Sequence, residues 1–227
     1  MKLISLHLPK TAGTSFGQSL KEKFKESFLT DYGDKGISKT TSVRNTSALL
    51  SSLEIANKGL GHINCVHGHF LPIKYLLLAT TQNLTFVTWM RDPVQRMISH
   101  YNFWKRDYDP KTAAHHHKQV IEENWTLEQF CLSPKFRNIY CQYLWGFPLE
   151  YFEFIGITEF YENDLSYFGE KYLKTPLKHK KLNTSNREAL KYSIDSRLCK
   201  EIEEYHKQDI ALYKRALELR KTRCMNR

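Results

Sequence analysis

Residues 2–28 read KLISLHLPKTAGTSFGQSLKEKFKESF, and this stretch indicates the fold class. Residues 2–8 alternate apolar and polar side chains, a pattern that predicts a strand, and a short loop follows at 9–13. The next large apolar residues recur at four-residue spacing, which predicts one face of a helix. They are Phe16, Leu20, Phe24 and Phe28. The chain is therefore expected to open with a strand, a loop and a helix.

The rest of the chain continues to alternate strands and helices. Further strands are predicted at 62–67, 84–90 and 152–157. Helices are predicted near 48–56, after 93, within 126–145, at 160–173 and, as one long element, at 195–219, with exposed segments at 31–47 and 105–118. The nearly continuous apolar run LTFVTWM at 84–90 is typical of a parallel strand that is buried on both faces. We expect one P-loop-like α/β domain over 1–227, with a mainly parallel sheet flanked by helices.

The end of the strand at 84–90 carries a clear helix-start signal. Asp92 suits the N-cap and Pro93 suits the first helical position. Gln95 falls three residues after the cap, where its side chain can reach back. A strand is therefore predicted to pass directly into a helix at this point.

Composition excludes several classes of protein. With 41% hydrophobic and 13% aromatic residues in 227, the chain is not a disordered tail. No segment approaches the roughly 20 apolar residues of a membrane span, so none is expected. Lysine and arginine exceed the acids by 34 to 24, which gives a net charge of +10 and favours anionic partners. On charge alone, a soluble protein with a basic surface explains this balance better than a specific anionic partner does.

Five cysteines are scattered through the chain without a C-x-x-C pair. This pattern predicts reduced thiols in an intracellular compartment. The start, MKLISLHLPK, has too short an apolar run for a secretory signal peptide. These features together predict a cytoplasmic protein.

The loop HLPKTAGTSF at 7–16 has the features of an anion site. A loop of small residues at a helix N-terminus offers backbone N–H groups and the positive end of the helix dipole. Its contributors would be the backbone of 11–15, including Ala12 and the close approach allowed by Gly13, the hydroxyls of Thr11, Thr14 and Ser15, and the charge of Lys10. The segment is not a Walker A motif, because its lysine precedes the glycine. The alternative is an ordinary strand–helix turn with a Ser/Thr cap.

A second candidate anion site lies in TWMRDPVQRMISHYNFW at 88–104. Arg91 ends the predicted strand, and Ser99 follows eight residues later, about two helical turns on. The two side chains could hold a second phosphate. Taken alone, Arg91 is as well explained as a salt-bridge partner.

As a pair, HLPKTAGTS and RDPVQRMIS resemble the sulfotransferases that use 3′-phosphoadenosine 5′-phosphosulfate (PAPS). The resemblance is to the branch that contains carbohydrate O-sulfotransferases such as heparan sulfate 2-O-sulfotransferase. It implies that the first motif binds the 5′-phosphosulfate, with Lys10 also acting in catalysis, and that Arg91 and Ser99 bind the 3′-phosphate. The segments FIGITEFYENDL at 154–165 and EYHKQDIALYKRAL at 204–217 also resemble the family, in the right order along the chain.

The sequence VHGHF at 66–70 ends a predicted strand, and strand ends in parallel sheets face the ligand crevice. The resemblance implies that the second histidine, His69, is the general base, with His67 as its neighbour. The alternatives are two structural histidines or a metal pair, but no third ligand is signalled nearby. The run His115–His117 is interpreted as part of a solvated loop.

The resemblance also implies a late loop that closes over the nucleotide. Its candidates are Lys181, Asn183, Ser185 and Arg187 in the basic segment 178–187, although a solvated loop explains them nearly as well. The expected reaction moves a sulfuryl group from PAPS to a hydroxyl acceptor, most simply on a carbohydrate, without a metal. The alternatives are a P-loop kinase or NTPase and a non-catalytic binder of an anionic polymer. No nucleic-acid-binding motif is present, so no nucleic-acid partner is expected.

Overall fold

A computed structural model describes residues 1–34, 36, 39–177 and 194–225 of the chain. Its centre is a five-stranded sheet with the strand order β2-β3-β1-β4-β5, and every neighbouring pair is parallel. The strands are β1 (Lys2–Leu6), β2 (Phe28–Thr30), β3 (Cys65–Gly68), β4 (Leu84–Met90) and β5 (Phe154–Ile157). The expected single α/β domain with a parallel sheet flanked by helices is therefore confirmed.

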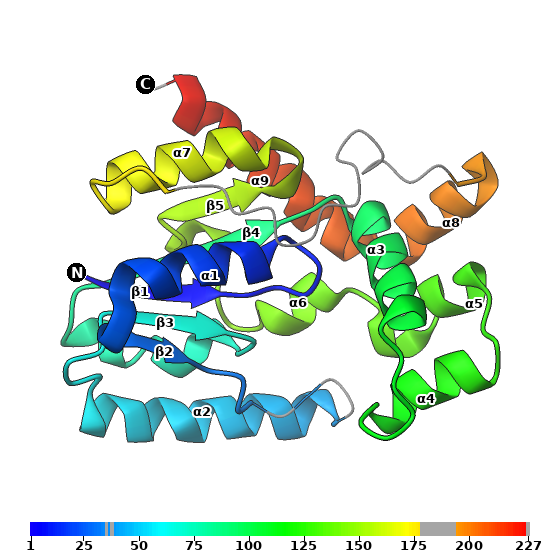
Figure 1. Cartoon of the computed structure of the whole chain (residues 1–227), viewed down its shortest axis with the longest axis horizontal. Helices are drawn as coiled ribbons and strands as arrows, with labels where there is room; N and C mark the ends of the chain where they lie inside the picture. The colour runs from blue at the N-terminus through cyan, green and yellow to red at the C-terminus, as the bar shows by residue number, and fades with distance from the viewer. Residues whose placement is uncertain (35, 37–38, 178–193, 226–227) are drawn as a thin grey trace.

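One face of the sheet packs against α1 (Gly13–Phe24) and α7 (Tyr161–Tyr172) (Figure 1). Alternate strand residues supply this core, because successive side chains in a strand point to opposite faces. Leu3, Val87, Trp89 and Phe154 meet Phe16 and Leu20 of α1 and Leu165 and Phe168 of α7. These side chains are all buried.

The other face packs against α6 (Ile139–Tyr143) and α9 (Lys207–Met225). The strand residues that alternate with those of the first core form a second core on this face. Ile4, Leu6, Phe86 and Ile155 pack there with Ile139, Tyr140, Tyr213 and Ala216. Both faces of the sheet are therefore covered, as its nearly continuous apolar strands require.

The remaining α-helices are α2 (Thr41–Lys58), α3 (Pro93–Arg106), α4 (His115–Glu122), α5 (Leu127–Cys131) and α8 (Ser196–Tyr205). Figure 1 shows α3, α4, α5 and α8 grouped beyond the carboxyl ends of the strands. At the start of α3, the Asp92 side chain accepts a hydrogen bond from the Gln95 backbone N–H at 2.9 Å, and Pro93 is the first helical residue. The predicted helix start is confirmed.

Several predicted boundaries are wrong. α1 ends at Phe24, where Lys25 has a positive φ of 47°, and Phe28 begins β2 instead of continuing the helix. The segment 31–47 is not a continuous exposed excursion, because α2 begins at Thr41 after a Thr40 cap. The strands predicted at 62–67 and 152–157 start later, at Cys65 and Phe154.

Two predictions in the second half also need correction. The predicted surface loop 105–118 contains the start of α4, because His115–His117 form its first turn with His116 buried. The predicted long terminal helix is two helices that meet at His206, whose ring is anchored by hydrogen bonds to Asn138 N–H (3.2 Å) and Cys131 C=O (2.7 Å). The remaining predicted helices lie within 126–145 and at Tyr161–Tyr172 as expected.

Candidate active site

The topology locates a crevice at the carboxyl ends of β1 and β4. In the plane of the sheet, β2 and β3 lie to one side of β1, and β4 and β5 lie to the other. Connections leave β1 and β4 in opposite directions, and ligands of open α/β sheets bind at such a switch point. The loop 7–12 follows β1, and Arg91 follows β4. The two segments singled out from the sequence therefore meet at the expected place.

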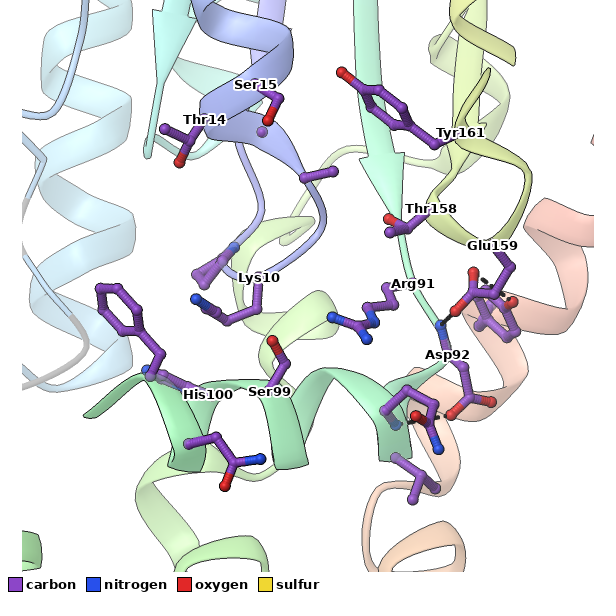
Figure 2. A pocket seen from close by; sticks show the side chains of 18 of the residues that line it. Lys10, Thr14, Ser15, Arg91, Asp92, Ser99, His100, Thr158, Glu159 and Tyr161 are labelled. Atoms are coloured by element: carbon purple, nitrogen blue, oxygen red, sulfur yellow. Dashed lines mark hydrogen bonds between the residues drawn. The ribbon is translucent and has the colours of Figure 1, made fainter. Parts of the chain in front are cut away.

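A pocket of about 1610 Å³ opens there. Its lining includes the predicted residues Lys10, Ala12, Gly13, Thr14, Ser15, His69, Arg91 and Ser99. Figure 2 shows Lys10 and Arg91 approaching from the sheet side, with Ser99 pointing between them from α3. Thr11, by contrast, is not part of this lining.

The loop before α1 presents backbone to the pocket. Lys10 and Ala12 both have left-handed backbone conformations, each with φ 66°, and α1 begins at Gly13. Among the described residues no side chain caps this helix. The first N–H groups of α1, at the edge of the pocket, are therefore available to an anion.

Two residues of this loop differ from their predicted roles. Thr11 is buried, and its hydroxyl donates to the Leu8 carbonyl at 2.8 Å, so its side chain holds the loop together instead of facing a ligand. Gly13 was expected to make room for a ligand, but it also makes room for the ring of His7. A Cβ at position 13 would lie 1.9 Å from Cδ2 of that ring. The ring of His7 needs a glycine at position 13.

Lys10 carries the positive charge of the loop. Its Nζ lies 3.7 Å from the centre of the Phe103 ring on α3. Burial, together with the nearby positive charges of Arg106 and Arg91, lowers the pKa of Lys10 to about 8. The amine is therefore a partly desolvated cation at neutral pH, and an anion placed beside it would favour its charged form.

Arg91 is a nearly buried cation at the end of β4, with 6% of its surface exposed. Its backbone is held by Tyr140 of α6, whose hydroxyl accepts from the Arg91 N–H at 3.0 Å and donates to the Arg91 C=O at 2.6 Å. The N–H of that second peptide group, on Asp92, is held too, because it donates to Glu159 at 2.9 Å (Figure 2). Glu159 also accepts from the Tyr213 hydroxyl at 3.1 Å. Arg91 is thus set in a rigid backbone.

His69 and His67 occupy different environments. Nδ1 of His69 is hydrogen-bonded to the His7 carbonyl, which requires a proton on Nδ1 and leaves the Nε2 lone pair unprotonated. His69 lines the pocket, and burial lowers its pKa below the ordinary imidazole value. His67 lies beneath α1, with Nδ1 2.8 Å from the Ser5 hydroxyl, and burial lowers its pKa to about 4. Of the two, only His69 is placed to meet a ligand.

Sequence reasoning missed several residues that shape the site. The ring of His7 lies 4.2 Å from that of His69, and its Nδ1 is 3.0 Å from the Tyr32 hydroxyl. Phe103, four residues after Ser99, could have been found by helical spacing. Tyr140 and Glu159 carry no local signal, because they reach the site only through tertiary packing.

No group of three or more His, Cys, Asp or Glu side chains in the described ranges is arranged to hold a metal ion. His117 instead lies with Nε2 2.8 Å from the Trp104 carbonyl. The candidates Lys181, Asn183, Ser185 and Arg187 fall outside the described residues. Every helix in the described part of the chain is too short or too polar to cross a bilayer.

The chain matches no model of a known protein family, and no curated protein is significantly similar to it in sequence.

Proposed function

We propose that the protein is a sulfotransferase that uses PAPS as its donor. One observation carries the proposal: an uncapped helix N-terminus with Lys10 and a nearly buried Arg91 with Ser99 face the same pocket. The donor has two separate anionic groups, a 5′-phosphosulfate and a 3′-phosphate. The pocket offers cationic side chains from two different segments, Lys10 after β1 and Arg91 after β4.

The residues fit the two groups in different ways. The first N–H groups of α1, with the hydroxyls of Thr14 and Ser15, suit the phosphosulfate, since such donors bind anions without a metal. Arg91 and Ser99 suit the 3′-phosphate, because a guanidinium binds phosphate with directed, charge-assisted hydrogen bonds.

His69 is the proposed general base. Bound PAPS would supply an electrophilic sulfur, to which the acceptor oxygen bonds as the bond from sulfur to the bridging phosphate oxygen breaks. Nε2 of His69, unprotonated because the His7 carbonyl holds the proton on Nδ1, takes the proton of the acceptor hydroxyl. Lys10 neutralises the charge that develops on the bridging oxygen, where a fixed cation is most effective.

The acceptor is proposed to be a hydroxyl of a carbohydrate. The +10 net charge suits anionic glycans. Aromatic side chains beside the pocket offer faces on which a sugar ring can stack; Tyr32 lies with its ring 4.9 Å from that of His69. Nucleic acid is not proposed as a partner.

We also propose that the enzyme works in the cytoplasm. The support is chemical: the five cysteines are unpatterned in sequence, no disulfide joins them, and Cys65 and Cys131 are buried separately in the two cores. Thiol titration of the natural full-length protein, denatured without reductant, should find all five thiols, and a disulfide would contradict the proposal.

The activity is tested by incubating the protein with PAPS, a chelator and a panel of sugars and phenols. Mass spectrometry should find an acceptor whose mass has increased by one sulfuryl group, together with adenosine 3′,5′-bisphosphate. Magnesium-dependent hydrolysis of ATP with no sulfuryl transfer would instead establish a kinase or NTPase. Binding of heparin that is indifferent to Lys10→Ala and His69→Ala, without transfer, would establish a non-catalytic module.

A further inference from the structure

Tyr140 makes an unusual contact with the backbone of Arg91. A single buried hydroxyl satisfies both polar groups of one residue, accepting from the N–H at 3.0 Å and donating to the C=O at 2.6 Å. The peptide groups on either side of the Arg91 Cα are thereby fixed to α6. The two residues are 49 positions apart in sequence, so the contact is purely tertiary.

Tyr140 is itself braced from the interior. Its backbone N–H donates to Asp209 of α9 at 3.0 Å, and the N–H of Cys141 donates to the same carboxylate at 3.1 Å. Asp209, which is fully buried, therefore caps the N-terminus of α6. The guanidinium of Arg96 lies 5.7 Å from the centre of the Tyr140 ring.

The chemistry of the hydroxyl suits this task. Burial raises the pKa of the Tyr140 phenol far above its ordinary value, even though the charge of Arg96 acts in the opposite direction. The phenol therefore keeps its proton at any working pH, so that it can donate to one group and accept from another. Phenylalanine has the same ring but leaves a buried N–H and C=O without this partner.

We propose that Tyr140 is a positioning residue for anion recognition by Arg91. The inference rests on the proposed function, in which Arg91 binds the 3′-phosphate. A guanidinium binds phosphate well only when its planar fork is correctly oriented. Tyr140 restricts the Arg91 backbone, so that the guanidinium has less freedom to move before a ligand binds. Binding an anion therefore costs less conformational entropy.

The test compares Tyr140→Phe with wild type by calorimetry, using adenosine 3′,5′-bisphosphate and adenosine 5′-monophosphate. We expect about a tenfold or greater loss of affinity for the bisphosphate, from weakened hydrogen bonds to a charged group. Affinity for the monophosphate, which lacks the 3′-phosphate, should stay within about twofold. The ratio of the two affinities is a readout that a general loss of stability does not change.

Tyr75→Phe is the matched control. It also removes a buried tyrosine hydroxyl, which donates to Asp31 at 2.6 Å. Asp31 directly follows β2, the edge strand that β3 and β1 separate from β4. Its ratio of affinities should equal that of wild type. If Tyr140→Phe does not fold, Asp209→Asn loosens the same brace while keeping the side-chain volume, and it should lower the ratio in the same direction.

The outcomes separate this inference from the proposed function. If wild type prefers the bisphosphate and Arg91→Ala abolishes the preference, but Tyr140→Phe or Asp209→Asn leaves it intact, then the inference is wrong and the proposed function stands. If wild type shows no preference for the bisphosphate, both are wrong.

Discussion

The ε-amino nitrogen of Lys10 lies 3.7 Å from the centre of the Phe103 ring, so the charge of the loop 7–12 packs on an aromatic ring of α3. This contact joins the two segments that the sequence singled out, since Phe103 lies four residues beyond Ser99 on the same helix. A cation over an aromatic ring is attracted to it, yet burial and two arginines hold the pKa of Lys10 near 8. The proposed catalytic cation is thus set close to its titration point.

This arrangement predicts a limit on the alkaline side of the pH profile. The pKa of Lys10 is lowered from 10.5 to about 8, so the amine is charged below that pH and loses its charge above it. We expect kcat/KM for PAPS, which reports the free enzyme, to fall as pH rises through about 8. The acid limb should lie below the ordinary imidazole pKa of about 6.5, because burial lowers the pKa of His69.

Lys10→Arg provides the control, because a guanidinium keeps its charge throughout this range. Any activity that remains should show no alkaline limb near pH 8. An unchanged limb in this variant would assign the titration to another group.

Alanine substitutions of the two histidines at the end of β3, His67 and His69, are expected to have different effects on turnover and stability. His69→Ala should reduce turnover by roughly 10²–10⁴, the usual contribution of a general base, while affinity for adenosine 3′,5′-bisphosphate stays nearly intact. His67→Ala should mainly lower the melting temperature, because His67 is buried beneath α1 and contacts Ser5. A larger loss of turnover in His67→Ala than in His69→Ala would reverse these assignments.

Gly13 and His7 are expected to be coupled energetically. A methyl group at position 13 would overlap the His7 ring, so Gly13→Ala should destabilise the protein by about 1–3 kcal/mol, as overpacking usually does. In the His7→Ala background the same substitution should cost far less. Urea unfolding of the two single variants and the double variant measures this coupling, and additive effects would show that the ring is not the obstacle.

The junction of β4 and α3 was predictable because its signals are local. A strand that is apolar on both faces, a capping aspartate and a proline at the first helical position lie in direct succession. The positions of the two candidate anion-binding segments were predictable for a related reason, since each follows a strand. That they meet depends on the parallel order of β1 and β4, which the alternation of strands and helices implies.

Other features could not be predicted because tertiary contacts decide them. Phe28 continues the helical spacing of α1, yet it belongs to a three-residue strand that pairs with β3. Thr11 looks like the other hydroxyls of its loop, but its side chain turns inward to the Leu8 carbonyl. The hydrogen bonds between the Tyr140 hydroxyl and the Arg91 backbone join segments that no local sequence pattern connects.

Binding of adenosine 3′,5′-bisphosphate, measured by calorimetry in the presence of a chelator, tests the central claim most directly. Wild type should bind it much more tightly than adenosine 5′-monophosphate, because Arg91 and Ser99 are proposed to bind the 3′-phosphate, which the monophosphate lacks. Arg91→Ala should lose a few kcal/mol of affinity for the bisphosphate and almost none for the monophosphate. Equal losses for both nucleotides, or binding that requires magnesium, would contradict the account.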